Sequence, residues 1–143
     1  MNLRFAFAVN NNGNFEKKHF GFADKYLIYE QISDKIVLSG EETNKFKLID
    51  KEHEHGSKKK GEVIIKFLRE KEVNVLVSMK FGNNIKMVNK YFIPVIIYSE
   101  KTEEVIDVLS KQLHWIKDEW ENKTSDFKLF TIKSGILKSS ITK

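Results

Sequence analysis

Val73-Asn74-Val75-Leu76-Val77 has the pattern of a β-strand that is buried on both faces. The apolar residues of 57–70, just before it, recur at helical spacing, and Gly82-Asn83-Asn84 after it opens a short helix through Lys90. Phe92–Tyr98 then repeats the buried-strand pattern, with Pro94 typical of a sheet edge or a strand start. Alternating helices and strands of this kind predict right-handed crossovers and parallel strands.

The residues upstream predict three more strands. Leu3–Val9 alternates bulky and small side chains and ends in an asparagine-rich turn, which suits a buried strand. Lys25–Gln31 and Lys35–Glu41 are separated by Ser33-Asp34, a pattern typical of a β-hairpin. Residues 43–60 are polar and lack a sustained apolar period, so we expect a mobile loop there.

One long helix is predicted to begin near Ser99 to Thr102, because a single apolar stripe runs on from there. The stripe consists of Val105, Leu109, Leu113, Ile116 and Trp120. The element order is therefore β-β-β-α-β-α-β-α, which predicts an α/β fold with a mixed sheet covered by helices. Residues 122–143 form a basic C-terminal extension. It could add a strand through Phe127, Leu129, Phe130 and Ile132 or end in disorder, and we lean slightly to the second.

Length and composition predict one compact domain. The 143 residues are 41% hydrophobic and 31% charged, enough to bury a core and stay soluble. No apolar run approaches a membrane span, and the start lacks the regions of a signal peptide, so we expect a cytoplasmic protein. The absence of cysteine excludes disulfides and thiolate-bound metal within the chain.

The net charge of +5 raises the question of nucleic-acid binding. Residues 1–123 hold 21 basic against 19 acidic residues, and residues 124–143 hold four against one. Most of the imbalance therefore lies in the tail, whereas charges of both signs interleave elsewhere, as on an ordinary solvated surface. This distribution speaks against nucleic acid as the main partner.

Three of the four histidines fall in segments that read as loops, where ligand-binding side chains usually lie. In an extended loop His53 and His55 would point to the same side, so both neutral imidazoles could face one metal ion. His19 could join them if the long loop folds back over the turn after the first strand. The alternatives stay open: two solvated histidines on a loop, and a His19 ring that pins the turn at Gly21 through a backbone hydrogen bond. His114 is assigned to a surface or packing role.

Lys58-Lys59-Lys60 lies at the expected start of a helix, where free backbone N–H groups favour anions. A solvated run of charge explains the same lysines equally simply. Catalysis has little support, because Leu3–Val9 carries none of the carboxylates that a two-metal nuclease needs. A P-loop, a dinucleotide fingerprint, a nucleophile elbow and an HExxH motif are all missing from the sequence, so we expect a protein that is not an enzyme.

Several of these segments together resemble one family. The Arg4–Val9 strand, His19-Phe20-Gly21 followed by Tyr26–Glu30, the histidine-bearing loop, and the Val73–Val77 strand running into Gly82 are similar to the dinitrogenase iron-molybdenum cofactor family over roughly residues 1–120. The family includes cofactor carriers of nitrogenase assembly and many small prokaryotic relatives of unknown role. The resemblance implies a ribonuclease H-like fold, with residues 1–121 as the domain and residues 122–143 as an extension outside it.

The resemblance also implies a site near the histidine loops for an iron–molybdenum cofactor or an iron–sulfur cluster precursor, although the purified protein could carry none. The candidate cofactor-binding residues are His19, Gly21, His53, His55 and Lys58, and the metal ligands among them are the three histidines.

Two functions follow from different classes. The first is a non-catalytic, nitrogen fixation-related carrier that passes its metal cofactor to a partner protein. The second is a protein- or RNA-interaction module that keeps the fold without the cofactor and binds through its basic tail. The sequence leaves the oligomeric state open.

Overall fold

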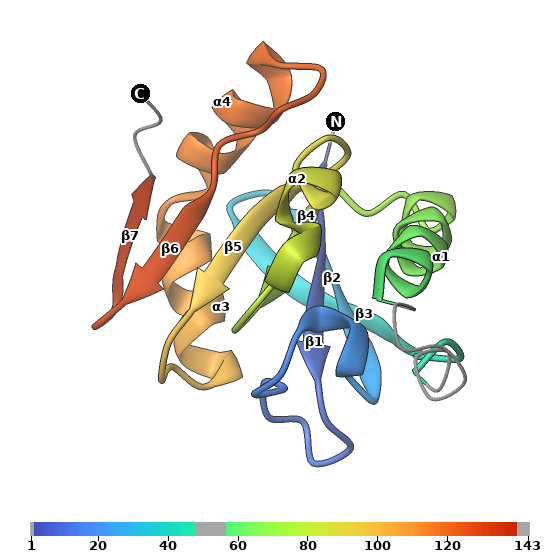
Figure 1. Ribbon diagram of the computed structural model, residues 1–143. Helices are drawn as coiled ribbons and strands as arrows, with labels where there is room; N and C mark the ends of the chain where they lie inside the picture. Colours follow the sequence, from blue (N-terminus) through green and yellow to red (C-terminus); the bar gives the residue numbers. More distant parts are fainter. Residues whose placement is uncertain (1, 48–56, 140–143) are drawn as a thin grey trace.

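A computed structural model describes residues 2–47 and 57–139, with the side chains of residues 57 and 58 excepted. One seven-stranded sheet in the order β3-β2-β1-β4-β5-β6-β7 forms the centre of the molecule (Figure 1). The strands are β1 (Arg4–Val9), β2 (Lys25–Ile32), β3 (Lys35–Thr43), β4 (Val75–Ser78), β5 (Ile93–Ile97), β6 (Phe130–Lys133) and β7 (Ile136–Ser139).

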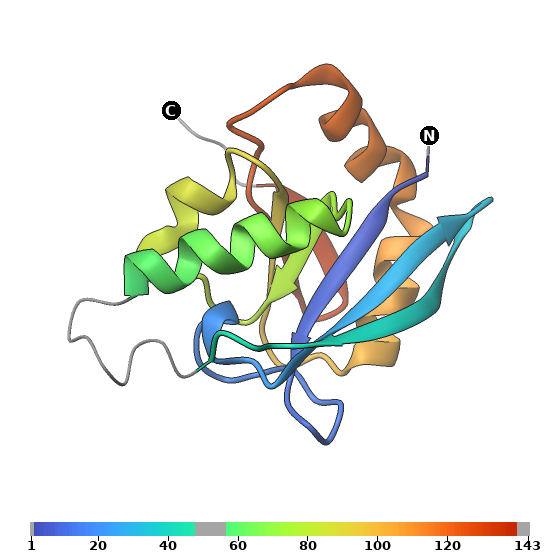
Figure 2. The same cartoon turned by 90° about the vertical axis from the view of Figure 1, so that its right-hand side faces the viewer.

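Helices cover both faces of the sheet, as the view in Figure 2 shows. On one face lie α1 (Ser57–Glu70) and α2 (Ile85–Val88), and on the other lie α3 (Thr102–Lys111) and α4 (Leu113–Asn122). Two single-turn 3₁₀ helices, η1 (Phe20–Phe22) and η3 (Gly82–Asn84), lie in the connections after β1 and β4. The expected fold, a mixed α/β sheet covered by helices, is confirmed.

Strand direction places four strand ends at one edge. Neighbouring pairs β1–β4, β4–β5 and β5–β6 are parallel, whereas β2, β3 and β7 each pair antiparallel to the strand before them in the chain. The carboxyl ends of β1, β4, β5 and β6 therefore lie along the same edge. In sheets with parallel strands this is the edge where ligands commonly bind.

The alternation of bulky and small residues in β1 is explained by the two layers of helices. Phe5 and Phe7 join the core under α3 and α4, whereas Ala6 and Ala8 face α1 in a second core. Small side chains on that face let α1 pack close to the centre of the sheet. The second core also contains Ile64, Ile65, Leu68, Leu76, Val88 and Phe92.

The prediction of one long helix after Thr102 is wrong. The chain breaks at Gln112, which leaves helical geometry at φ −118° and ψ 24° and whose N–H is shared between the carbonyls of Val108 and Leu109. Leu109 before the break and Leu113 and Ile116 after it all enter the same core. The apolar stripe was read correctly, but two successive helices bury such a stripe as well as one does.

The inclination toward a disordered tail is also corrected, because residues 130–139 form the β6–β7 hairpin. Phe130 and Ile132 are fully buried, and β6 pairs in parallel with β5. Ser134 and Gly135, with φ of 53° and 73°, make the two-residue turn, where positive φ matches the twist of the strands. Lys133 and Lys138, two of the four lysines near the chain end, therefore belong to the sheet.

Candidate functional site

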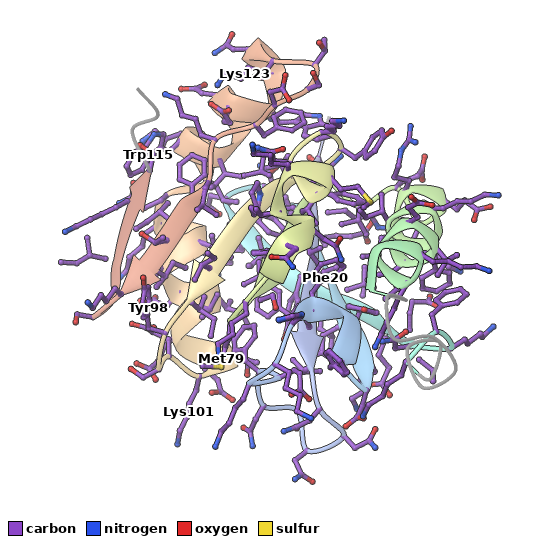
Figure 3. The ribbon with its side chains drawn as sticks, viewed as in Figure 1. Phe20, Met79, Tyr98, Lys101, Trp115 and Lys123 are labelled. Carbon is purple, nitrogen blue, oxygen red and sulfur yellow. The ribbon has the colours of Figure 1, made fainter. Side chains whose placement is uncertain are left out.

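The His19–Phe22 segment lies at the carboxyl-end edge of the sheet, against the residues that follow β4. His19 forms a parallel bridge with Lys80, and the Phe20 N–H donates to the Lys80 carbonyl at 3.0 Å. Figure 3 shows Met79 and Lys101 at this end of the molecule, and Trp115 and Lys123 at the opposite end. The segment and the β4–η3 turn together form the candidate site.

The ring of His19 packs directly on Gly82. Gly82 has φ +64°, and a Cβ atom added to it would lie 2.7 Å from Cε1 and 2.8 Å from Nδ1 of His19. Glycine is needed here both for the left-handed backbone and for the close approach of the imidazole. Within the described residues, no hydrogen bond to the His19 ring is formed, so packing holds the ring in place.

Two side chains that sequence analysis does not single out hold the backbone of the His19–Phe22 segment through hydrogen bonds. The buried Tyr26 hydroxyl donates to the Phe20 carbonyl at 2.8 Å, and burial raises its pKa, so it stays protonated. Asn44 donates from Nδ2 to the carbonyls of Gly21 and Ala23, at 3.0 and 2.8 Å. The Phe20 carbonyl also accepts from the Ala23 N–H at 3.3 Å, whereas the carbonyls of Gly21 and Ala23 depend on Asn44 for a donor. These bonds fix the backbone of the segment before any ligand arrives.

Gly21 serves close packing and not a left-handed turn. It is buried, and a Cβ atom there would lie 3.3 Å from Cε of Lys60 in α1. Lys60 is only 2% exposed, and its Nζ lies 3.7 Å from the centre of the Phe22 ring. Lys18 reaches the same ring at 5.4 Å. Positive charge therefore gathers around Phe22, beside His19.

The chain leading away from this segment is tied to it as well. Asp24 accepts hydrogen bonds from Lys47 Nζ and from the Asn11 N–H. The bond from Lys47 lowers the pKa of Asp24, although burial opposes it. Residues 44–47 are thereby held beside both the turn after β1 and the His19–Phe22 segment.

The cavity at the site is small. Its lining includes His19, Phe22, Lys60, Gly61 and Asn84, and its volume of about 10 Å³ is room for one water molecule at most. A metal cluster could not enter it and would have to lie on the outer surface.

The other predicted site residues are less well placed by the structure. His53 and His55 lie outside the described residues, and Lys58 is within the first turn of α1, although its side chain is not described. Across residues 2–47 and 57–139 no group of three histidine or carboxylate side chains could hold a metal ion. His19 is therefore the one predicted ligand whose position is established.

Gly82, Asn44 and Tyr26 are the site residues that sequence reasoning missed. The sequence indicates that Gly82 opens a helix after a strand, and Gly82 is among the features that carry the family resemblance, but neither signal indicates its contact with His19. Asn44 lies in a polar stretch without a pattern, and Tyr26 reads as an ordinary strand residue. Their roles depend on contacts between segments far apart in the chain.

The chain forms a small α/β domain with a histidine at the carboxyl-end edge of its sheet. In sheets with parallel strands, ligands commonly bind at this edge. The chain belongs to the dinitrogenase iron-molybdenum cofactor family, whose model matches residues 1–112. That match runs from β1 to the end of α3, and it includes the whole His19 site. No curated protein matches the chain. Among the described helices, none is long and apolar enough to cross a membrane.

Proposed function

We propose that the protein is a non-catalytic carrier that binds an iron–sulfur or iron–molybdenum type cluster as cargo and passes it to a partner protein. The observation that carries this proposal is the His19 ring, which rests on Gly82 at the sheet edge with both nitrogens free of protein hydrogen bonds among the described residues. Membership in the dinitrogenase iron-molybdenum cofactor family supports the class of cargo.

Both ends of the segment that carries His53 and His55 are anchored beside His19. Asn44 on one side bonds to Gly21, and Lys60 on the other side packs against the same glycine. His53 is four residues from Ser57, a span of at most about 14 Å. The chain length therefore allows both imidazoles to reach the surface over His19, and we propose the three histidines as the cluster ligands.

The charge around the site suits an anionic cargo. Lys18 and Lys60 lie against Phe22, and α1, which carries Lys60, has no acidic residue in its first turn. An anionic cluster would be attracted to these groups and held at the imidazoles. Because the cavity is too small to enclose it, the cargo would stay exposed to a recipient.

Anaerobic incubation with ferric iron, dithiothreitol as reductant and sulfide, followed by desalting, absorbance and metal analysis, tests the proposal. The wild type should retain iron and show charge-transfer absorbance, whereas a variant with His19, His53 and His55 all changed to alanine should lose both. His114→Ala, with an exposed imidazole in α4, is the matched control and should load like the wild type. Equal iron content in the wild type and the triple variant would refute the carrier function.

An interaction module without cargo is the second candidate function. Its original basis, a basic tail, is weakened because Lys133 and Lys138 of this tail lie in β6 and β7. A different feature now favours protein interaction: an open groove with basic margins beside the site, between α1 and α2.

A further inference from the structure

A groove of about 810 Å³ runs between α1 and the η3–α2 turn, on the face of the sheet that carries these helices. Its floor is apolar and consists of Ile65 from α1 together with Met87 and Tyr91 from α2 and the residues after it. Tyr91 is 38% exposed although it lines this floor. Such a groove is of a size that can receive side chains of a ligand or of another chain.

The margins of the groove are strongly basic. Lys66 and Arg69 line it from α1, and Lys86 and Lys90 line it from the other side, against the single carboxylate of Glu62. Within residues 2–47 and 57–139, none of these four basic side chains forms an ion pair with a carboxylate. Elsewhere lysines such as Lys25, Lys71 and Lys111 do so.

A contact between two side chains holds one end of the groove together. The guanidinium carbon of Arg69 lies 4.1 Å from the centre of the Tyr91 ring, so this pair joins α1 to the chain after α2. At the other end a Cβ atom on Gly61 would lie 2.6 Å from Asn84 Nδ2, which shows how closely α1 and η3 approach. These two contacts hold α1 and the η3–α2 turn close together in the absence of a partner protein.

We propose that this groove docks an acidic, amphipathic segment of a partner protein. The apolar side chains of the segment would cover Ile65, Met87 and Tyr91, and its carboxylates would meet the four basic side chains. Charge complementarity identifies the occupant, because the margins carry an excess of positive charge that no carboxylate pairs with in the part of the chain that the structure describes. An amphipathic helix in an apolar groove is a common recognition mode.

A nucleic acid fits the groove less well. Phosphates would neutralise the basic margins, but they would leave the apolar floor of Ile65 and Met87 without a matching surface. One face of Tyr91 is occupied by Arg69 and is closed to base stacking. The observations therefore favour an acidic peptide over a nucleic acid.

The groove adjoins the His19 site, because Asn84 lines both. A partner seated in the groove would lie next to the histidine, where a carrier would hand over its cargo. The docking inference stands without that assignment, since its test uses no metal.

The test uses a fluorescent 16-residue helical peptide with leucines at i, i+3, i+4 and i+7 spacing and glutamates elsewhere. A matched peptide with lysines in place of the glutamates and a 12-base-pair DNA duplex of equal label serve as comparisons. Fluorescence anisotropy should show that the glutamate peptide binds the wild type and that salt weakens the complex. Its binding should shift the NMR signal of the Met87 methyl group.

The double variant Lys86→Glu/Lys90→Glu should bind the glutamate peptide about tenfold more weakly, as expected for two reversed surface pairs. Lys35→Glu/Lys138→Glu makes the same change of charge at exposed positions on β3 and β7 and should bind like the wild type. Unchanged melting by circular dichroism verifies the fold of each variant. The inference is overturned if the glutamate peptide does not bind, if both double variants weaken it equally, or if the duplex binds more tightly than the peptide.

Discussion

The imidazole of His19 rests on the Cα atom of Gly82, so closely that a Cβ atom at Gly82 would lie 2.7 Å from the ring. These two residues are far apart in the sequence and belong to different connections, one after β1 and one after β4. Parallel pairing of β1 with β4 brings the two connections to the same edge. The position of the histidine is therefore a consequence of the sheet topology.

Gly82→Ala should displace His19 and reduce stability. Gly13→Ala is the matched control, because Gly13 also has positive φ, +81°, but has nothing within 4 Å of an added Cβ atom. Backbone strain alone costs about 1 to 2 kcal/mol at either position. In urea unfolding, Gly82→Ala should therefore cost more than Gly13→Ala. Equal losses would show that the His19 ring is not seated on Gly82.

Asn44→Ala should loosen the His19–Phe22 segment. The variant leaves the buried carbonyls of Gly21 and Ala23 without their donor, at a cost of about 1 to 3 kcal/mol. Amide hydrogen exchange at Phe22 and Ala23 should become faster than global unfolding predicts. Asn12→Ala, at an exposed turn position, should leave the exchange of these amides unchanged. If the amides of Phe22 and Ala23 exchange as slowly in Asn44→Ala as in the wild type, Asn44 does not hold this segment in place.

Glu100 should make the free energy of unfolding depend on pH. Burial would raise the pKa of this carboxylate, but hydrogen bonds from the backbone N–H groups of Gly135, Tyr98 and Ser99 outweigh burial and lower it. The pKa of Glu100 is therefore lower in the folded chain than in the unfolded chain. Its ionised carboxylate stabilises the folded state at pH values above the unfolded pKa, and this stabilisation is lost as the pH falls through the folded pKa.

Denaturant unfolding between neutral pH and pH 3 would measure this effect. Glu100→Gln should be less stable than the wild type at neutral pH, and the difference should shrink as the solution becomes acidic. Glu121→Gln, at an exposed position of α4, should follow the wild-type curve. A constant difference across the pH range would show that the carboxylate charge of Glu100 is not stabilising.

Ile132→Ala tests whether the chain end is part of the sheet. Ile132 is fully buried in β6, so truncation should cost about 2 to 5 kcal/mol. Ile136, the matched isoleucine in β7, is 55% exposed, and its change to alanine should have little effect on the free energy of unfolding. Similar small losses in both variants would indicate that residues 130–139 do not pack as β6 and β7.

Local periodicity was sufficient to predict much of the fold. The helix over residues 57–70 is confirmed because its apolar residues recur at helical spacing. The hairpin around Ser33-Asp34 is confirmed because a turn separates two segments with strand character, although β3 itself is mostly exposed. The break at Gln112 could not be predicted, since the stripe continues through it. β6 was ambiguous because only four residues pair, and their burial depends on β5 offering a free edge.

The candidate site was predictable only in part. His19 was recognised from its residue type and its place in a loop, but its seat on Gly82 depends on the pairing of β1 with β4. Likewise, the hydrogen bonds from Asn44 cross more than twenty positions of the chain. Contacts of this kind follow from the tertiary structure and leave no periodic signal in the sequence.

The most direct test of the central claim is NMR of the histidine ring nitrogens while ferrous iron and sulfide are added anaerobically. The account predicts that the His19 signals broaden or shift in proportion to bound iron. The signals of His114, in α4 on the other face of the sheet, should stay unchanged and serve as the internal control. Bound iron with His19 signals as sharp and unshifted as those of His114 would contradict the proposed site.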